Sequence, residues 1–387
     1  MIDLILGYGR SGRAAHAFLQ KQNRKVIIWD DEGEKPFMDW DAVQRVILSP
    51  GIGPDHPVLL EAIRKKKEII GEVELGARFT TNTCIGITGT NGKTTVTEMV
   101  VHTLRYAGKK AVALGNIGRP LCDYLLYPDP EDILVLELSS FQLETMQTCF
   151  LDRAVFLNVS PDHLDRYRNF SEYRDAKCRI ATLLRPEGLL FFFQRDSSLF
   201  EQVNQQRIIA SFEDSEYTRY GDNERAVFSI CSSLGVAKET FLKSLPSFER
   251  PTHRLEKVKE IRGISFYNDS KATNKESVRF ALNQIPFEKI FLLAGGIDKG
   301  GSWNCVLNHK VKSIFAFGTS ANQIERELGS EFKVKKVKSL KEAISEAYQM
   351  ARKGDCILLS PGCSSFDQFD HYEHRGDTFK SLVEELK

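Results

Sequence analysis

Residues 84–95 of the chain read CIGITGTNGKTT, and they carry the strongest indication of its fold. Apolar Ile85 and Ile87 alternate with small residues, as expected for a buried strand, and a glycine-rich turn then ends in GKTT. The next residues, VTEMVVHTLRYAG, have apolar side chains at helical spacing and end at Gly108. The stretch therefore predicts a strand, a glycine loop and the start of a helix.

A glycine loop at the start of a helix forms a binding site for an anion, because free backbone N–H groups and the helix dipole attract phosphate. Lys93 can reach the outer phosphates of a nucleotide, and the Thr94 hydroxyl can ligate Mg²⁺. The strict P-loop pattern has glycine five residues before Gly92, where this chain has Ile87. A simple glycine turn is the alternative, but the lysine and two threonines favour ATP binding. The residues expected to contact ATP here are Gly89, Thr90, Asn91, Gly92, Lys93, Thr94 and Thr95.

The composition limits the class of protein. A chain of 387 residues is longer than one ordinary core, so two or three domains are expected. The net charge of +1 argues against nucleic acid or an anionic membrane as a partner. The sequence has no run of about 18 apolar residues and no signal-peptide pattern, so no membrane insertion is expected. Eight cysteines without a CxxC pair fit reduced thiols, and we expect a cytoplasmic protein that acts as a monomer.

Predicted strands alternate with predicted helices along the whole chain, which favours an α/β fold with mostly parallel sheets. A change in composition at residues 78–83 and the prolines that bracket residues 247–250 suggest domain boundaries. We expect three α/β domains: a Rossmann-like domain at 1–79, a P-loop domain with a parallel sheet at 80–249 and a Rossmann-like domain at 250–387. The expected strands are at 2–6, 25–29, 45–48, 85–87, 133–137, 154–158, 188–193, 264–267, 289–293, 313–317 and 356–359.

Residues 7–12, GYGRSG, form a complete GxGxxG motif between the strand at 2–6 and a helix expected at 12–22. Asp30 ends the next strand, at the position where an acidic residue can bind a ribose hydroxyl. The motif indicates a diphosphate site at a helix N-terminus, and an NAD-dependent oxidoreductase is one interpretation. The same pattern also occurs where a chain merely makes a tight turn, so both interpretations stay open here.

Further distinctive blocks lie between the glycine loop and the end of the chain. These blocks are ELSSFQLE from Glu137, NVSPDHLDRY from Asn158, YRDAKCRI from Tyr173, NDSKATN from Asn268, GGIDKG from Gly295 and SPGCSSFDQF from Ser360. With GTNGKTT, they resemble the signature sequences of the Mur ligases, in particular the branch that adds D-glutamate to UDP-N-acetylmuramoyl-L-alanine. The resemblance extends from Gly7 to Tyr372 in matching order.

The resemblance implies a bacterial enzyme of peptidoglycan synthesis whose first domain binds UDP rather than NAD. ATP, D-glutamate and UDP-N-acetylmuramoyl-L-alanine are then the substrates, and no NAD is expected. The UDP-linked substrate is expected at Gly9, Arg10, Ser11, Gly12, Asp30, Ser49 and Gly51, with Asn116 and His163 from the central domain.

The chemistry of such a ligase can be argued separately. Joining an amine to a carboxylate in water requires an activated carboxylate, because hydroxide is a poor leaving group. ATP can supply a phosphoryl group, and the amine then attacks the resulting acyl phosphate. Both transition states gather negative charge, so the site needs cations and positioned donors. Metal ions that bridge phosphate and carboxylate oxygens are the usual solution.

Thr94, Glu137 and His163 offer ligands for a metal in the central domain. The resemblance implies two Mg²⁺ ions and a carbamylated Lys177, in a helical segment expected at 172–182. Simpler interpretations are a solvated carboxylate for Glu137, a surface or capping residue for His163 and a surface lysine for Lys177. The residues expected to take part in catalysis are Lys93, Glu137, His163, Lys177 and Lys299.

By the same resemblance, the third domain adds a second group of polar residues. Each could instead be a solvated residue on a loop, and only the matching blocks favour binding. D-Glutamate needs donors at both of its carboxylates. Because these residues and Lys93 belong to different expected domains, catalysis should require interdomain closure. ATP is expected at Arg254, Asp269 and Lys271, and D-glutamate at Thr273, Lys299, Ser365, Phe366 and Tyr372.

The chain departs from the family pattern at the adenine site. The family has a second asparagine three residues after Asn223, where this chain has Ala226. Asn223 is kept as an ATP contact, and adenine recognition is expected to be loosened or rearranged. The chain is also short between Asp30 and Arg45 and across residues 194–220, so trimmed loops are expected there.

Other functions stay open from the sequence. A different ligase of the family would add L-alanine, a diamino acid or a folate-linked glutamate, although ELSSFQLE and SPGCSSFDQF favour D-glutamate. A nucleotide-dependent switch protein would hydrolyse ATP without making a product, but the cations and metal ligands argue against it. An NAD oxidoreductase is the remaining alternative.

Overall fold

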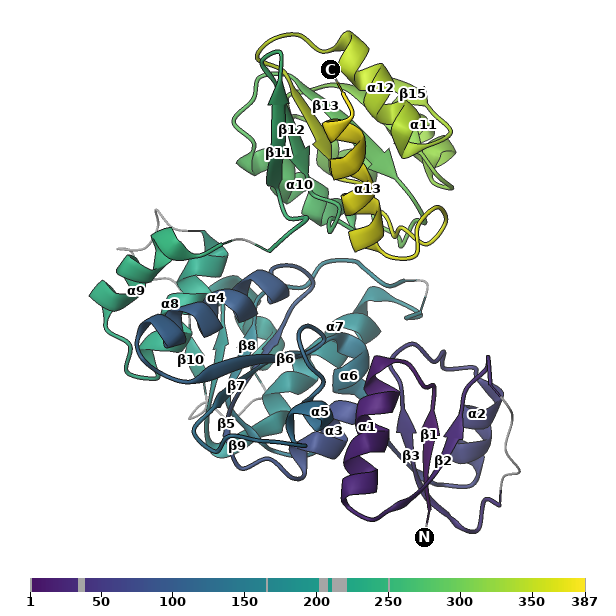
Figure 1. The fold of residues 1–387 in the computed structure, drawn as a ribbon, viewed down its shortest axis with the longest axis vertical. Coiled ribbons are helices and arrows are strands. Elements are labelled where there is room, and N and C mark those ends of the chain that lie inside the picture. Colours follow the sequence, from purple (N-terminus) through teal and green to yellow (C-terminus); the bar gives the residue numbers. More distant parts are fainter. Residues whose placement is uncertain are drawn as a thin grey trace. The chain divides into compact units, whose positions relative to one another are not determined.

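The computed structural model describes residues 2–33, 39–164, 166–201, 208–210, 221–249 and 251–386. It contains three β-sheets flanked by helices (Figure 1). The chain forms two compact units, one of Met1–Val159 and Ser171–Glu249, the other of Ser160–Phe170 and Arg250–Lys387. The predicted α/β class is confirmed, because strands alternate with helices and the sheets are mostly parallel. The domain boundaries after residues 79 and 249 stay predictions.

The first sheet has the strand order β2-β1-β3-β4, and its neighbouring strands are parallel. Its elements are β1 (Ile2–Leu6), α1 (Arg10–Lys21), β2 (Lys25–Trp29), β3 (Val43–Leu48), α2 (Pro57–Arg64), β4 (Glu68–Gly71) and α3 (Glu72–Ala77). Leu4 and Leu6 belong to the core cluster that includes α2, whereas Ile5 belongs to the cluster that includes α1. The apolar run in β1 therefore reflects a strand that is buried on both faces.

The central sheet has the order β10-β9-β8-β5-β7-β6, and it is parallel throughout. Its strands are β5 (Thr83–Thr88), β6 (Ala111–Gly115), β7 (Ile133–Glu137), β8 (Leu151–Phe156), β9 (Leu184–Phe192) and β10 (Ile208–Ala210). Its helices are α4 (Lys93–Tyr106), α5 (Leu121–Tyr124), α6 (Ser140–Glu144), α7 (Phe170–Cys178), α8 (Asp222–Ser232) and α9 (Lys238–Ser244), with 3₁₀ turns at Arg179–Leu183, Gln194–Phe200 and Leu245–Ser247.

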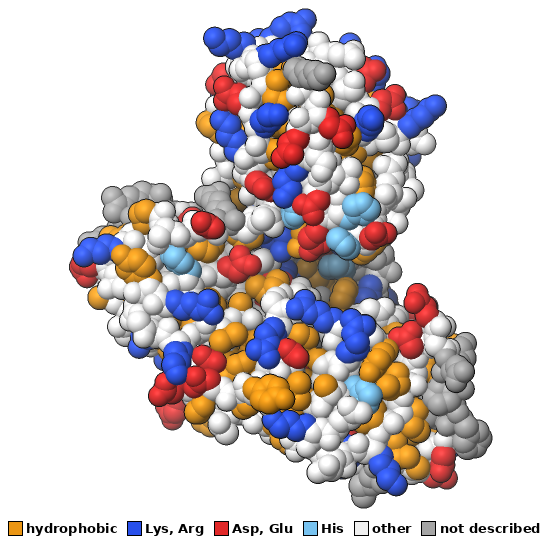
Figure 2. Space-filling model, viewed as in Figure 1, with side chains coloured by type: hydrophobic (Ala, Val, Ile, Leu, Met, Phe, Trp, Pro, Cys, Tyr) orange, Lys and Arg blue, Asp and Glu red, His pale blue; other side chains and the backbone are white. Residues whose placement is uncertain are grey.

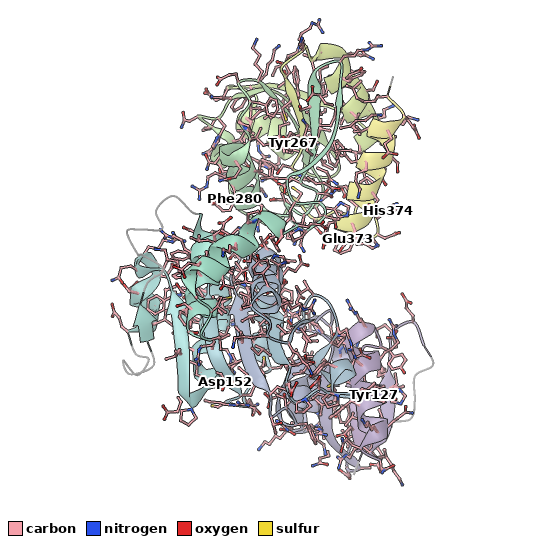
Figure 3. All side chains as sticks on the ribbon, turned by 60° about the vertical axis from the view of Figure 1, so that its left-hand side comes forward. Tyr127, Asp152, Tyr267, Phe280, Glu373 and His374 are labelled. Carbon is pink, nitrogen blue, oxygen red and sulfur yellow. The ribbon has the colours of Figure 1, made fainter. Side chains whose placement is uncertain are left out.

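The strand order determines which residues of the central sheet meet. β5 lies between β8 and β7, so the residues that follow these parallel strands lie along one edge. Asp152, near the start of β8, marks the opposite edge (Figure 3), where its Oδ2 accepts a hydrogen bond from Cys84 N at 2.8 Å. The glycine loop after β5 lies at the carboxyl edge, which is the edge where α/β proteins bind ligands.

The third sheet has the order β11-β12-β16-β13-β14-β15, and only its β11–β12 pair is antiparallel. Its strands are β11 (Glu256–Ile261), β12 (Ile264–Asn268), β13 (Ile290–Gly295), β14 (Val311–Phe317), β15 (Lys333–Lys336) and β16 (Cys356–Leu359). Its helices are α10 (Lys275–Gln284), α11 (Ala321–Leu328), α12 (Leu340–Met350) and α13 (Tyr372–Glu384), with a 3₁₀ turn at Trp303–Val306. α10 and α11 contribute to one core cluster of the sheet, and α12 and α13 contribute to the other.

The structure corrects several predicted elements. β4, β6, β10, β11 and β15 were not expected, and the first helix begins at Arg10 rather than residue 12. β11 and β15 read EKVKEI and KVKK, so these edge strands lack the apolar pattern that identifies buried strands. The helical segment expected at 172–182 changes from α-helix to a 3₁₀ turn after Cys178. The trimmed loops expected after Asp30 and across 194–220 fall partly outside the described residues.

The surface agrees with the near-neutral composition. Acidic and basic side chains are interspersed over the face shown in Figure 2. Among the described helices, none is long and apolar enough to cross a membrane.

A buried carboxylate links the strands of the first sheet. Asp3 on β1 is fully buried and lies between two arginines. Arg24 Nε, just before β2, donates to Asp3 Oδ2 at 2.9 Å, and Arg45 Nε, on β3, donates to Asp3 Oδ1 at 2.7 Å. Each guanidinium group also makes a second, longer bond to the same carboxylate. These ion pairs join the central strand β1 to the chain on both sides of it.

Replacing Asp3 with alanine should destabilise the first unit. Asp3→Ala leaves two guanidinium groups without their carboxylate, and breaking a buried ion pair costs about 3–5 kcal/mol. Because Arg24 is partly exposed and can regain water, we expect a loss near the lower limit in the free energy of unfolding measured with urea. Asp41→Ala, at an exposed position, is the control and should change this free energy by less than about 0.5 kcal/mol. Equal losses in the two variants would contradict the prediction.

Candidate active site

The glycine loop between β5 and α4 has the backbone geometry of a phosphate cradle. Gly89 and Gly92 have φ angles of 156° and 86°, which residues with side chains rarely adopt. A Cβ on Gly92 would lie 2.6 Å from Asn223 Oδ1, so this position has no room for a side chain. The Lys93 ammonium, at the start of α4, donates to the carbonyl oxygens of Gly89 and Thr90, both at 2.9 Å. The loop therefore has a cation beside the N-terminus of a helix, the arrangement that attracts an anion.

α7 brings a second lysine to this loop. Lys177 is 2% exposed, and its Nζ donates to the Gly89 carbonyl at 2.8 Å. The same Nζ lies 4.8 Å from the centre of the Tyr173 ring, and the Tyr173 hydroxyl lies 3.1 Å from Thr90 Oγ1. The alternative of a surface lysine is wrong, because the side chain is buried against the loop. The carbamate that the resemblance implies stays a prediction.

Glu137 ends β7, beside the loop strand β5, and its side chain is buried. Asn116 Nδ2 donates to Glu137 Oε1 at 2.8 Å, whereas the buried Oε2 has no hydrogen-bond partner in the described part of the chain. An unpaired buried carboxylate oxygen is costly, and a bound cation would satisfy it. Glu137 and the buried Thr94 hydroxyl thus fit Mg²⁺, which prefers oxygen ligands. Burial also makes a solvated strand-end carboxylate the wrong interpretation of Glu137.

The other predicted ligand, His163, belongs to the second unit. The backbone N–H of His163 donates to Asp162 Oδ1 at 2.9 Å, and its ring Nε2 lies 3.9 Å from Asp162 Oδ2. Asn274 Nδ2 donates to the same Oδ2 at 2.9 Å. Burial alone would raise the pKa of Asp162, but the charges of His163 and Lys299 and these hydrogen bonds outweigh it and lower the pKa. Asp162 is therefore a buried carboxylate next to His163 that also feels the charge of Lys299, a feature that the sequence did not indicate.

In the described residues, no group of three or more His, Cys, Asp and Glu side chains is arranged to hold a metal ion. The predicted ligand set accordingly depends on hydroxyl and carbamate oxygens as well as on Glu137 and His163. This set stays a prediction.

The predicted nucleotide contacts of the second unit surround a buried carboxylate. Burial raises the pKa of Asp269 to about 7, although a hydrogen bond from Ser360 Oγ at 2.8 Å and the nearby charge of Arg254 oppose the shift. Leu255 N donates to the other oxygen of Asp269 at 3.3 Å. The Lys271 ammonium lies 5.2 Å from the centre of the aromatic ring of Tyr372. Asp269 and Arg254 thus lie close together, as the predicted ATP site requires.

Arg375 on α13 is a structural residue that the sequence did not reveal. It is fully buried, and its guanidinium donates to the carbonyl oxygens of Ser270 at 2.8 Å and Cys363 at 3.2 Å. Ser270 Oγ in turn donates to the carbonyl oxygen of Tyr372 at 2.8 Å. These bonds join the loops after β12 and β16 to the start of α13, where Glu373 and His374 are labelled in Figure 3. An arginine in a helical pattern is expected on the surface, so no sequence signal could have identified it.

The loops joined by Arg375 carry most of the residues predicted to bind D-glutamate. Ser365 is buried, whereas the Phe366 side chain is 69% exposed. Thr273 follows β12, and its N–H donates to the Lys271 carbonyl at 2.9 Å. Lys299 lies on the loop after β13 and is close enough to Asp162 to lower the pKa of that carboxyl. The predicted residues thus share one unit, and their contact with D-glutamate stays a prediction.

The GxGxxG turn of the first sheet is held by its predicted neighbours. Gly7 has a φ of 88°, and a Cβ on Gly12 would lie 2.2 Å from the Gly7 carbonyl oxygen. Asp30 Oδ2 accepts a hydrogen bond from Tyr8 N at 2.6 Å, and Ser49 Oγ donates to the Gly7 carbonyl at 2.7 Å. Asp30 and Ser49 therefore shape the turn directly, and their contact with a UDP ribose stays a prediction. Three further residues predicted to contact the UDP-linked substrate are exposed: Gly9, Arg10 and Gly51.

Two asparagine predictions gain structural context. The side-chain amide of Asn116, a residue expected to contact substrate, donates a hydrogen bond to the Glu137 carboxylate. Asn223 at the start of α8 lies against the glycine loop, and Ala226 on the same helix is fully buried. The second asparagine of the family pattern is thus replaced by a small core residue. Thr95, on the first turn of α4, and Ser11, on that of α1, are both half-buried.

Comparison with known proteins places this arrangement in a family. The model of the Mur ligase middle domain matches residues 87–241, and that of the Mur ligase glutamate ligase domain matches residues 253–363. The Mur ligase fold recurs in UDP-N-acetylmuramate-alanine ligase MurC from Thermotoga maritima, with a TM-score of 0.64, 17% identity and coverage of 100% of both chains. The chain belongs to the Mur ligase family.

The curated relatives within this family point to one member of it. A UDP-N-acetylmuramoylalanine–D-glutamate ligase from Protochlamydia amoebophila (strain UWE25) is 39% identical over 434 residues, covering 99% of this chain and 98% of the relative. A ligase of the same name from Chlamydia pneumoniae is 35% identical over 416 residues, with coverage of 99% and 98%. The resemblance seen in the sequence motifs is therefore confirmed.

The raised pKa of Asp269 predicts a pH dependence of stability. The unfolded chain loses this proton near the ordinary pKa of 3.8, whereas the folded protein keeps it up to about pH 7. The folded state therefore binds more protons in this range, so the contribution of Asp269 to stability falls as pH rises from about 4 to 7. Urea unfolding at pH 5 and pH 8 should show a smaller fall in the free energy of unfolding for Asp269→Asn than for the wild type.

The control for this prediction is Asp370→Asn, at a side chain that is 85% exposed. Asp370→Asn should keep the wild-type difference between the two pH values. If Asp269→Asn also keeps it, burial does not raise the pKa of Asp269.

Proposed function

We propose that the protein is an ATP-dependent ligase that joins D-glutamate to UDP-N-acetylmuramoyl-L-alanine and releases ADP and phosphate. The observation that carries the proposal is the glycine loop with Lys93 and Lys177 beside a buried Glu137 oxygen that lacks a hydrogen-bond donor. Full-length similarity to ligases named for D-glutamate supports the two other substrates. The solved MurF ligase from Thermotoga maritima in complex with ADP, with a TM-score of 0.64, supports a nucleotide site in this fold. The product is a precursor of peptidoglycan.

The loop holds the phosphates of ATP through the N–H groups at the start of α4 and through Lys93. The carboxylate of UDP-N-acetylmuramoyl-L-alanine attacks the outer phosphorus atom, and ADP leaves. Two Mg²⁺ ions, when bound, neutralise charge on the phosphates and on the attacking carboxylate. The residues that would hold these ions are Thr94, Glu137, His163 and Lys177 as a carbamate.

The acyl phosphate then reacts with the amine of D-glutamate through a tetrahedral intermediate, and phosphate leaves. Lys299 supplies a positive charge for the negative charge that gathers on the substrate. Charge-assisted donors orient the two carboxylates of D-glutamate so that its amine faces the acyl carbon. The residues proposed for D-glutamate are Thr273, Lys299, Ser365, Phe366 and Tyr372.

The remaining contacts divide between two nucleotides. Arg254 and Lys271 offer positive charge to ATP, Asp269 offers an acceptor for its ribose, and Asn223 faces its base. The UDP group binds at the first sheet, with Asn116 and His163 closer to the reacting carboxylate. The residues proposed for the UDP group are Gly9, Arg10, Ser11, Gly12, Asp30, Ser49 and Gly51.

We also propose that the protein is cytoplasmic and acts as a monomer. All eight cysteines are free, as expected in a reducing compartment. Light scattering on the purified protein tests the oligomeric state, and a mass of twice 43.9 kDa would contradict a monomer.

Phosphate release from ATP should depend on D-glutamate. With UDP-N-acetylmuramoyl-L-alanine and Mg²⁺ present, L-glutamate, L-alanine and diaminopimelate should support much slower release. Lys299→Ala removes a charge-assisted donor worth about 1.5–3 kcal/mol, so the KM for D-glutamate should rise roughly tenfold or more. Lys289→Ala, at an exposed lysine, is the control and should keep the wild-type KM. Equal turnover with L-alanine would exclude the D-glutamate assignment.

The carbamate on Lys177 can be tested separately from the substrate. Lys177→Arg keeps a positive charge but cannot take up CO₂, so its turnover should fall by about 10–100-fold or more, as when a group that supports a metal site is lost. ¹³C-bicarbonate should give a carbamate carbon signal in the wild type that is absent in Lys177→Arg. Near-wild-type turnover of this variant would mean that Lys177 acts as an ordinary cation.

The metal ligand Glu137 has a matched control on the same sheet. Glu137→Gln should weaken Mn²⁺ binding measured by electron paramagnetic resonance, because the amide replaces the anionic oxygen that lacks a donor. Glu187→Gln, at an exposed glutamate on β9, should leave Mn²⁺ binding unchanged. Equal Mn²⁺ affinities in the two variants would remove Glu137 from the ligand set.

A further inference from the structure

Asn158 lies at the place where the chain leaves the first unit. β8 ends at Phe156, and Asn158 follows it at the carboxyl edge of the central sheet. Val159 is the last residue of the first unit in this stretch, and Ser160 is the first residue of the second unit. A single residue therefore separates Asn158 from the segment that carries Asp162 and His163.

Asn158 is bonded to the glycine loop through its backbone and through both ends of its side-chain amide. Its carbonyl oxygen accepts from Thr90 N at 2.9 Å, and its Oδ1 accepts from Asn91 N at 2.9 Å. Its Nδ2 donates to the Asn91 carbonyl oxygen at 3.1 Å. The two side-chain hydrogen bonds engage both the backbone N–H and the carbonyl group of Asn91, so they fix the orientation of this residue as well as its position.

The packing around these bonds leaves little freedom. A Cβ on Gly89 would lie 3.0 Å from Leu157 Cβ and 3.3 Å from Asn158 N. Leu157 N also donates to the carbonyl oxygen of Thr88, the last residue of β5, at 3.0 Å. Residues 157–158 thus follow the first half of the loop at contact distance, and the loop cannot move without moving them.

We propose that Asn158 is a positioning residue that holds Thr90 and Asn91 for nucleotide binding and transmits the state of the loop to residues 160–164. This inference rests on the proposed function, because it requires ATP to bind at the loop. A phosphate bound at the start of α4, directly after Asn91, restricts the motion of the loop. Since consecutive Cα atoms are about 3.8 Å apart, Ser160 stays close to Asn158 whatever the conformation of Val159, so a restraint on Asn158 also limits where Ser160 can move.

The test compares two substitutions of Asn158 with a matched substitution elsewhere. Asn158→Ala removes both side-chain bonds and keeps the backbone bond to Thr90. Asn158→Asp has nearly the same shape and keeps the acceptor, but it turns an oxygen toward the Asn91 carbonyl. Asn322→Ala makes the same chemical change at an exposed asparagine of α11 and is the control.

ATP affinity and kinetics give the first measurement. In Asn158→Ala the dissociation constant of ATP should rise roughly tenfold, as expected from the loss of two hydrogen bonds of ordinary strength. Asn158→Asp should show a similar rise, because it loses one bond and sets a carboxylate oxygen against the Asn91 carbonyl oxygen. The KM for ATP should rise with it, while the KM for D-glutamate stays within about twofold of the wild type. Asn322→Ala should match the wild type in all three quantities.

Amide hydrogen exchange gives the measurement that a merely structural role would not change. In the wild type, ATP should slow exchange in peptides that cover residues 159–164. In the two Asn158 variants, saturating ATP should leave exchange in these peptides unchanged while it still protects the loop at residues 89–95. This comparison is made within each variant with and without ATP, so a general loss of stability cancels.

The outcomes separate this inference from the proposed function. A wild-type protein that does not bind ATP would overturn both. ATP binding by the wild type, together with wild-type affinity and wild-type protection of residues 159–164 in the two variants, would overturn only the role of Asn158. If Asn158→Ala does not fold, the isosteric Asn158→Asp decides the matter.

Discussion

The hydrogen bonds of the glycine loop are the constraint on which the rest of the central site depends. The carbonyl groups of Gly89 and Thr90 receive ammonium groups from Lys93 and Lys177, so lone pairs that would repel a phosphate are turned toward cations. The N–H groups of Thr90 and Asn91 are taken by Asn158. The next residues, from Gly92 onward, form the start of α4, which is the positive end of the helix dipole. One strand–loop–helix connection therefore determines both where an anion binds and which cations face it.

Buried polar residues organise the segments around this loop. Glu74 on α3 is fully buried, and its carboxylate accepts from the N–H groups of Gln147 and Thr148 at 2.8 and 3.0 Å. It joins the helix after the first sheet to the chain that follows α6. Asp3 and Arg375 act similarly in the first and third sheets. Each such group has several partners, which is the condition under which a buried charge can be retained.

The sequence predicted the parts of the fold that bury apolar faces. β1 and β16 were identified because strands buried on both faces give short apolar runs. β5 was identified from the alternation of Ile85 and Ile87 with small residues, and the P-loop motif located α4 correctly. The charged edge strands β11 and β15 could not be identified, because their strand conformation depends on pairing with β12 and β14 and not on an apolar pattern of their own.

At the site, the sequence motifs identified residues that lie within the matching blocks, such as Lys93, Glu137 and Lys177. They could not predict that Asp30 bonds Tyr8 N, or that Arg375 is buried, because long-range packing decides both. Asn158 belongs to one of the recognised blocks, yet its hydrogen bonds to Asn91 depend on β8 lying beside β5. A motif therefore identifies a residue more readily than it identifies that residue's partner.

The edge of the third sheet has a consequence for the protein in solution. β15 reads KVKK, and it leaves one row of backbone groups without a neighbouring strand in the described sheet. Such a row is a template on which another chain can add a strand and begin an aggregate. A strand added there would have to fit beside three lysines, and charged side chains on an edge strand oppose such pairing. Lys335 and Lys336 are ion-paired with Glu346 and Glu325, so this edge presents charged groups of both signs, which protect it from aggregation.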